Sequence, residues 1–142
     1  MATGMQRTVR RALLARLKAD AGLTAIVPAA SINPAGEPTW PFIILRSPVS
    51  RQLKAAQLNG QEGSWDIHAF ARDRLVSGAK VETGEDHCSR IGAAIERVLA
   101  DNRLALEGSL VAKISLSDMR LLPDESPDAW HYVAQINWRG LA

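Results

Sequence analysis

Apolar side chains near the start of the chain recur at steps of three and four residues, the spacing of one buried helix face. This stripe consists of Val9, Leu13, Leu14 and Leu17. The pattern predicts a helix over residues 7–21, with most of its arginines on the other faces. Gly22 follows, and we expect it to form the C-cap, where glycine accepts a positive φ without strain.

Two stretches after this helix have the pattern of strands. Residues 41–46 form an apolar run rich in β-branched side chains, which predicts a buried strand. Residues 64–72 alternate between apolar and polar positions and predict a strand with one face in the core. The polar segment 50–64 between them is either a long loop or the tip of an extended hairpin. Residues 72–74 are predicted to form a turn that leads into a helix.

The second helix has the clearest pattern in the chain. Its apolar stripe consists of Cys88, Ile91, Ile95, Val98 and Leu99. Thr83 is placed to cap its start, and Asp86 three residues later completes a loose capping box. The helix is expected to end near residues 101–102.

Two further strands are predicted after this helix. Residues 110–121 alternate, but the apolar positions change parity near Ser117 and Asp118, which indicates a β-bulge. Residues 123–128 are rich in turn formers, and residues 130–139 alternate again. Trp130, Tyr132 and Trp138 share one face of this last strand. That face carries no Lys or Arg, which favours a core or protein-contact role over a stacking platform for single-stranded nucleic acid.

The predicted order is helix, strand, strand, helix, strand, strand. Two hairpin-like pairs separated by a helix favour an α+β domain rather than a doubly wound sheet. We therefore predict an antiparallel sheet of about four strands, with the two main helices packed on one face.

Composition sets further bounds on this domain. The chain has 142 residues, 46% hydrophobic and 23% charged, which fits a single globular domain over residues 1–142. The single cysteine excludes an internal disulfide and a multi-cysteine zinc site. No apolar run is long enough for a membrane-spanning helix. The lone thiol and the lack of a secretory signal favour synthesis in a reducing cytoplasm.

Charge is distributed unevenly along the chain. The first 20 residues carry five basic side chains and one acidic one, whereas the whole chain has a net charge of only +2. A solvated helix face is the commonest reason for such a segment, although mitochondrial transit peptides share this composition. The asymmetry also allows copies of the chain to associate head-to-tail. Candidate charges for such a subunit interface are Arg7, Arg10, Arg11, Glu82, Glu85, Asp124 and Glu125.

The sequence contains no nucleophile elbow, phosphate-binding loop or dinucleotide fingerprint. His87 and Cys88 are adjacent, but neighbours on a helix lie about 100° apart, and Cys88 belongs to the apolar stripe. We therefore expect a buried structural thiol. His68 and His131 fall on different predicted strands, where a strand-face role is favoured over metal ligation. We expect no enzyme activity, no cofactor and no metal.

Several local strings follow one another in a specific order. They are RALLARLKAD at 11–20, LTAIV at 23–27, WPFIIL at 40–45, WDIHAFAR at 65–72, LALEG at 104–108 and WHYVAQI at 130–136. Their order and spacing over about residues 7–139 resemble the tail completion, or tail-terminator, proteins of long-tailed bacteriophages, prophages and gene transfer agents. Residues 28–32 depart from this family, whose members often have a glycine-arginine turn there.

The resemblance implies a structural virion protein without a catalytic site. Such proteins form a ring, typically of six subunits, at the head-proximal end of the tail tube. The ring ends tube polymerisation and joins the tail to the head or neck, and DNA passes through its channel without specific binding. Implied partners are other copies of the chain, the tail tube protein, a neck or stopper protein and the tape measure protein. The polar arm at 50–64 is a candidate inter-ring contact through Arg51, Lys54, Gln57, Asn59 and Gln61.

Three alternative functions remain at this point. The first is a neck stopper or adaptor, since these rings also contain small subunits without catalytic sites. The second is a nucleic-acid-binding module that uses the basic side chains of the first helix. The third is a small hydrolase that uses His87 or Cys88.

Overall fold

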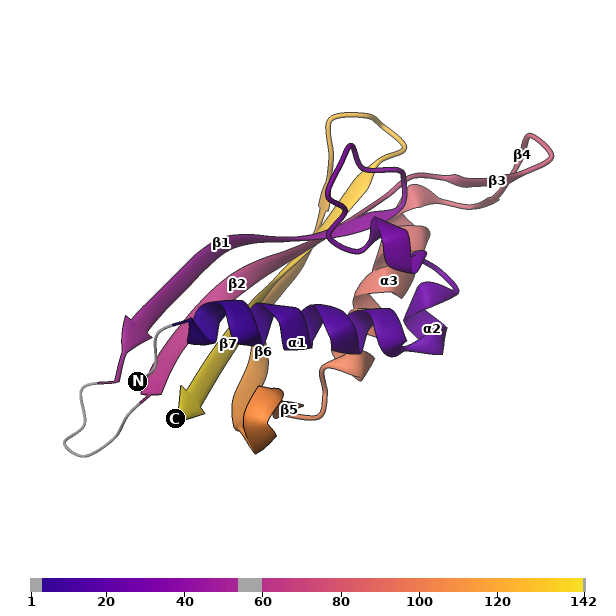
Figure 1. The fold of residues 1–142 in the computed structure, drawn as a ribbon. Helices are drawn as coiled ribbons and strands as arrows, with labels where there is room; N and C mark the ends of the chain where they lie inside the picture. The colour runs from indigo at the N-terminus through magenta and orange to yellow at the C-terminus, as the bar shows by residue number, and fades with distance from the viewer. Residues whose placement is uncertain (1–3, 54–59, 142) are drawn as a thin grey trace.

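The computed structural model of the chain describes residues 4–53 and 60–141 and has an α+β fold (Figure 1). Its helices are α1 (Met5–Ala19), α2 (Ala21–Thr24) and α3 (Gly84–Val98). Its strands are β1 (Phe42–Gln52), β2 (Gly60–Ala71), β3 (Arg74–Val76), β4 (Ala79–Glu82), β5 (Arg103–Ala105), β6 (Val111–Pro123) and β7 (Trp130–Leu141). The predicted fold class is confirmed. No helix of the described residues is long and apolar enough to cross a membrane.

The main sheet has five strands in the order β1-β2-β7-β6-β5, and every neighbouring pair is antiparallel. The last strand, β7, therefore lies in the middle, and it pairs with β2 along its whole length without a register shift. β3 and β4 form a separate two-stranded hairpin, which projects from the body of the molecule (Figure 1).

The core lies between one face of the sheet and the helices α1 and α3. The predicted stripes of both helices point into it. The side chains of Leu13, Leu17, Ile91 and Ile95 are fully buried there. Burial of a large aliphatic side chain contributes about 1.5–3 kcal/mol, so these stripes hold the helices on the sheet. The opposite face of the sheet carries mostly half-buried and exposed side chains.

Several local predictions are confirmed. The Thr83 hydroxyl caps α3 by accepting a hydrogen bond from the Asp86 backbone N–H at 3.2 Å. β6 has a register shift between Ser117 and Arg120, and Asp118 within it has a φ of 53°. Trp138 and Tyr132 are buried against the helices, as the alternation of the last strand predicts.

Other predictions are wrong. α1 ends at Ala19, and the C-cap is Asp20 rather than Gly22, which lies inside α2. The Asp20 carboxylate instead caps α2, accepting from the Leu23 N–H at 2.8 Å, and pairs with Arg97 at 2.7 Å. α3 ends at Val98, three residues short of the expected end, because β5 begins soon afterwards.

The sheet contains more strand than the sequence pattern predicts. Within the polar segment 50–64, β1 and β2 remain paired as far as Gln52 and Gln61. The described part of this segment is therefore a hairpin arm and not a loop. The predicted turn at 72–74 is followed by the β3–β4 hairpin instead of a helix. β5 is a three-residue edge strand, too short for alternation to reveal it.

Gly92 allows α3 to approach β7 closely. A Cβ atom at this position would lie 2.5 Å from Cδ1 of the Tyr132 ring, closer than real Cβ contacts. The Tyr132 ring thus packs directly on the helix backbone, and its hydroxyl donates a hydrogen bond to the Glu96 carboxylate at 3.1 Å.

We expect Gly92→Ala to lower the free energy of unfolding by about 1–3 kcal/mol, because the added methyl group overpacks against Tyr132. An ordinary glycine in a helix behaves oppositely, since alanine there adds about 1 kcal/mol. Urea denaturation measures whether the free energy of unfolding falls or rises. The neighbouring exposed position supplies the control: Ala93→Gly should be destabilising by about 1 kcal/mol from helix propensity alone. A stabilised Gly92→Ala variant would contradict the packing.

Glu82 fastens the β3–β4 hairpin to α3. Its carboxylate lies 2.8 Å from Nη2 of Arg90 on the helix and 3.2 Å from Nε of Arg74 on β3. The Glu82 side chain is only 8% exposed. The hydrogen bonds from Arg90 and Arg74 outweigh the effect of burial and lower the Glu82 pKa from 4.5 to about 2.

A depressed carboxylate pKa gives stability that is complete above pH 4.5 and is lost as the pH falls through about 2. We therefore expect Glu82→Gln to lower the free energy of unfolding by about 2 kcal/mol at pH 7. The difference from the wild-type chain should shrink steadily between pH 4.5 and pH 2. Urea denaturation at several pH values measures it. Glu37→Gln, in an exposed loop, is the control and should change the free energy of unfolding at pH 7 by less than about 0.5 kcal/mol.

Candidate interaction surfaces

The His87 and Cys88 pair is part of the core. Both side chains are buried, and the ring nitrogen Nδ1 of His87 donates to the Arg72 carbonyl at 2.8 Å. The Cys88 thiol donates to the Ala69 carbonyl at 3.4 Å. Burial raises the pKa of this thiol to about 12, which leaves almost no nucleophilic thiolate near neutral pH. The geometry therefore fits the structural role predicted for Cys88.

His68 and His131 lie side by side on the face of the sheet away from the helices. Nδ1 of His68 and Nε2 of His131 are 2.6 Å apart, and the rings stack on Phe70 together with Phe42. Burial is the main cause that lowers the pKa of both histidines, and the charge of Arg46 acts in the same direction. Among the described residues no third acidic, histidine or cysteine side chain joins them in a metal-binding group. The pair belongs to an aromatic cluster on this face of the sheet.

Charged side chains form a single row across the open face at one end of the sheet. Arg51 pairs in register with Glu62, Glu62 with Arg139, Arg139 with Lys113, and Lys113 with Arg103. Directly opposed residues point to the same face of a sheet, so all five side chains share the open face. We call the four cations Arg51, Arg103, Lys113 and Arg139 the basic row.

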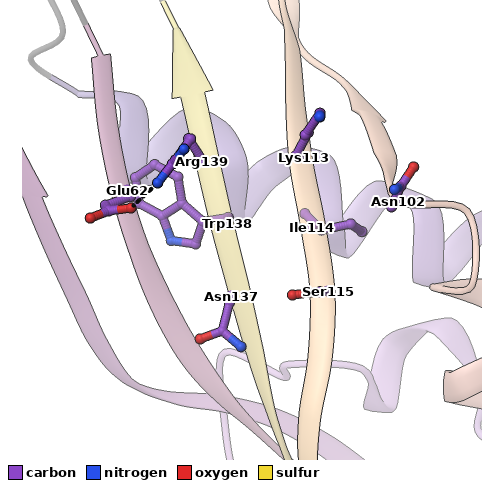
Figure 2. A pocket seen from close by; sticks show the side chains of 8 residues that line it. All are labelled: Glu62, Asn102, Lys113, Ile114, Ser115, Asn137, Trp138 and Arg139. Atoms are coloured by element: carbon purple, nitrogen blue, oxygen red, sulfur yellow. Dashed lines mark hydrogen bonds and ion pairs between the residues drawn. The ribbon is translucent and has the colours of Figure 1, made fainter. Parts of the chain in front are cut away.

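Glu62 neutralises only one end of the basic row. Its carboxylate lies 3.1 Å from Arg139 and 3.2 Å from Arg51, and the hydrogen bond from Arg139 is the main cause that lowers its pKa. Figure 2 shows Arg139 bent toward Glu62, with Lys113 standing free on the next strand. Beside these residues is a hollow of about 580 Å³, lined by Asn102, Arg103, Val111, Lys113 and Arg139.

The arginines of α1 lie at the same end of the molecule. The Met5 side chain, in the first turn of α1, packs on Gly140 of β7, next to Arg139. Arg7 is exposed, Arg10 is half-buried, and Arg11 forms a long 3.6 Å ion pair with Glu107. This part of the chain therefore has a clear surplus of positive charge.

Carboxylates gather at the opposite end of the sheet. The turn between β6 and β7 is closed by the Asp124 N–H, which donates to the Ala129 carbonyl at 2.9 Å. The carbonyl of Asp128 in this turn abuts Gly84, the first residue of α3. The two segments together present five half-buried or exposed carboxylates, which we call the acidic end: Glu85, Asp86, Asp124, Glu125 and Asp128.

The predicted interface charges thus separate into two groups in space, with Arg7, Arg10 and Arg11 at one end and Glu85, Asp124 and Glu125 at the other. Glu82 is occupied by Arg74 and Arg90 within the chain. Of the predicted arm contacts, Arg51 is exposed on β1 and Gln61 is half-buried on β2. Lys54, Gln57 and Asn59 lie outside the described residues. The interface role of all these side chains stays a prediction.

Two surfaces were missed by sequence reasoning. Arg103, Lys113 and Arg139 occupy outward positions of their strands, but only the strand register reveals that they adjoin. The β3–β4 hairpin exposes Leu75, Val76 and Val81, each about half accessible to solvent. Its Leu-Val and Val positions around a Ser-Gly turn are the sequence signal that could have revealed it. Exposed apolar side chains on a projecting element are typical of protein contacts.

Comparison with known proteins places the fold. A model of the family described as tail completion protein gp17 matches residues 11–140. One chain in a structure of the virion of a native gene transfer agent particle aligns with a TM-score of 0.74 and 17% identity, over 99% of this chain and 100% of that chain. A second solved structure aligns with a TM-score of 0.54 and 16% identity, over 96% of this chain and 95% of that chain.

No curated protein matches the chain by sequence. At 16–17% identity, the two solved structures show a shared fold. The family model is the stronger finding because it covers most of the chain, including α1, α3 and nearly all of the sheet. It confirms the resemblance drawn from the sequence strings: the chain belongs to the tail completion protein gp17 family, a family of structural proteins of phage tails.

Proposed function

We propose that this chain forms a ring, typically of six copies, at the head-proximal end of a tail tube. There it ends tube polymerisation and joins the tail to the head or neck. The observation that carries this proposal is the family match over residues 11–140. The full-length fold similarity to a chain of a gene transfer agent virion supports it.

The surfaces of the chain suit assembly better than chemistry. Repeated head-to-tail contacts generate rings when the rotation between copies closes, and open-ended stacks when it does not. A ring whose upper face differs from that of the tube stops the stack beneath it. The charged ends, the projecting hairpin and the arm each offer a contact for such an assembly.

The proposed partners are other copies of the chain, the tail tube protein, a neck or stopper protein and the tape measure protein. DNA passes through the channel without specific binding. A net charge of +2 suits this passage, since many contacts to phosphate would retain the duplex. We place the protein in the tail or neck of the virion after synthesis in the bacterial host cytoplasm.

When this protein is absent, we expect tails longer than the regular length, because nothing ends the tube. We also expect heads that lack tails, because nothing offers them a docking surface. Electron microscopy of a deletion strain measures both, and expression of the chain from a plasmid should restore them. A stopper or adaptor predicts another outcome, namely regular tails beside heads that have lost their DNA. That result would overturn the assignment to the tube end.

The hairpin arm is a proposed contact with the neighbouring ring. We expect Arg51→Ala with Gln61→Ala to weaken binding to purified tails at least tenfold. Surface ion pairs such as Arg51–Glu62 contribute only about 0–1 kcal/mol, so the fold should remain intact. Cosedimentation with tails measures binding. Arg120→Ala with Gln135→Ala, in the middle of the open face and away from the arm, is the control and should bind normally. Equal binding by both variants would remove the arm from the contact.

A further inference from the structure

The two charged ends of the chain are complementary. We propose that neighbouring copies in the ring bind each other through them, with Arg103, Lys113 and Arg139 of the basic row in one copy receiving the acidic end of the next. This contact presupposes the ring proposed above and identifies the surfaces that close it.

The basic row is an unfavourable arrangement within one copy. Arg103, Lys113 and Arg139 stand directly opposite one another on three consecutive strands. Like charges in such cross-strand positions are destabilising. Glu62 pairs with Arg139, but Arg103 and Lys113 form no ion pair with any described residue. Arg103 and Lys113 therefore need carboxylate partners that the described residues of the same copy do not supply.

The surroundings of the row leave room for those carboxylates. Arg103, Lys113 and Arg139 line the hollow of about 580 Å³ on the open face, together with Asn102 and Val111. Lysine and arginine heads around an open hollow form short, charge-assisted hydrogen bonds with carboxylates that enter it.

The acidic end has the matching surplus. None of its carboxylates forms an ion pair with the described residues, and Glu85, Asp86 and Glu125 are exposed. Arg139 in the row lies nine positions after Trp130, which is next to the acidic turn, along β7. At about 3.3 Å per residue this distance is about 30 Å, too far for the two surfaces to meet within one copy. They can meet only between copies.

The orientation of the two surfaces favours a ring over a straight stack. Side chains of the row stand roughly perpendicular to the sheet, on the face opposite α1. The acidic turn instead extends the sheet along its strands (Figure 1). Seating the turn of one copy on the open face of the next therefore rotates each copy relative to the last. Repeated rotation is the geometry that closes a ring.

Charge reversal in both surfaces tests this contact. One variant carries Arg103→Glu and Lys113→Glu, a second carries Asp124→Lys and Glu125→Lys, and a third combines all four changes. Each purified chain is examined by native mass spectrometry and light scattering, alone and bound to purified tails. Binding of short duplex DNA at low salt is measured in parallel.

We expect each double variant to need at least a tenfold higher concentration for half-assembly. The fourfold variant should return to within threefold of the wild-type chain, and so should an equal mixture of the two double variants. Both restore opposite charges at every contact. Higher salt should weaken the wild-type assembly.

The thermal midpoint of the free chain distinguishes a role of the row in the contact between copies from a role in folding. Lys113→Glu alone removes like-charge repulsion in the row, so the thermal midpoint of the free chain should rise while assembly weakens. A fall in both would assign the row to folding.

Other outcomes overturn the proposal in distinguishable ways. If the wild-type ring forms and the double variants assemble equally well, the ring stands and this interface is wrong. If the double variants fail but the fourfold variant is not restored, the row meets some other partner. If the Arg103→Glu and Lys113→Glu variant loses DNA binding but assembles normally, the row binds DNA phosphates and not a neighbouring copy. A wild-type chain that stays at 15.4 kDa both free and with tails overturns the ring as well.

Discussion

The structure depends on the central position of β7, which pairs with β2 on one side and β6 on the other. Its inner face contributes Tyr132, Ala134, Ile136 and Trp138 to the core. This strand therefore forms the middle of the sheet and joins the β1–β2 side to the β6–β5 side. The same strand fixes the charged surfaces, because Arg139 lies near its end and the acidic turn precedes its start.

The parts of the fold that sequence predicts well are those with a local physical cause. α3 has a stripe, a cap and a charged first turn that all indicate the same helix, and the parity change near Ser117 and Asp118 reveals the bulge. The parts that sequence misses depend on distant segments. β5 is three residues long and is a strand only because β6 lies beside it. The sequence pattern predicts the wrong end for α1, because the Asp20 side chain caps the following short helix α2, and Gly22 lies inside that helix.

The same distinction holds for the candidate surfaces. Sequence identifies which residues are charged and which helix is basic, and the structure sorts these charges into two ends. The basic row could not be predicted, because the opposition of Lys113 to Arg139 and Arg103 exists only once the strand register is known. Proteins retain strained or repulsive groups mainly where function uses them, so such a row identifies a binding surface more sharply than net charge does.

The buried thiol has a consequence for the particle outside the cell. A structural protein of a phage tail must survive in aerated surroundings, where exposed cysteines oxidise and cross-link neighbouring subunits. Cys88 is the only cysteine of the chain, and its thiol is sealed between α3 and the sheet. Copies of this chain therefore cannot be cross-linked to one another through Cys88 while they stay folded.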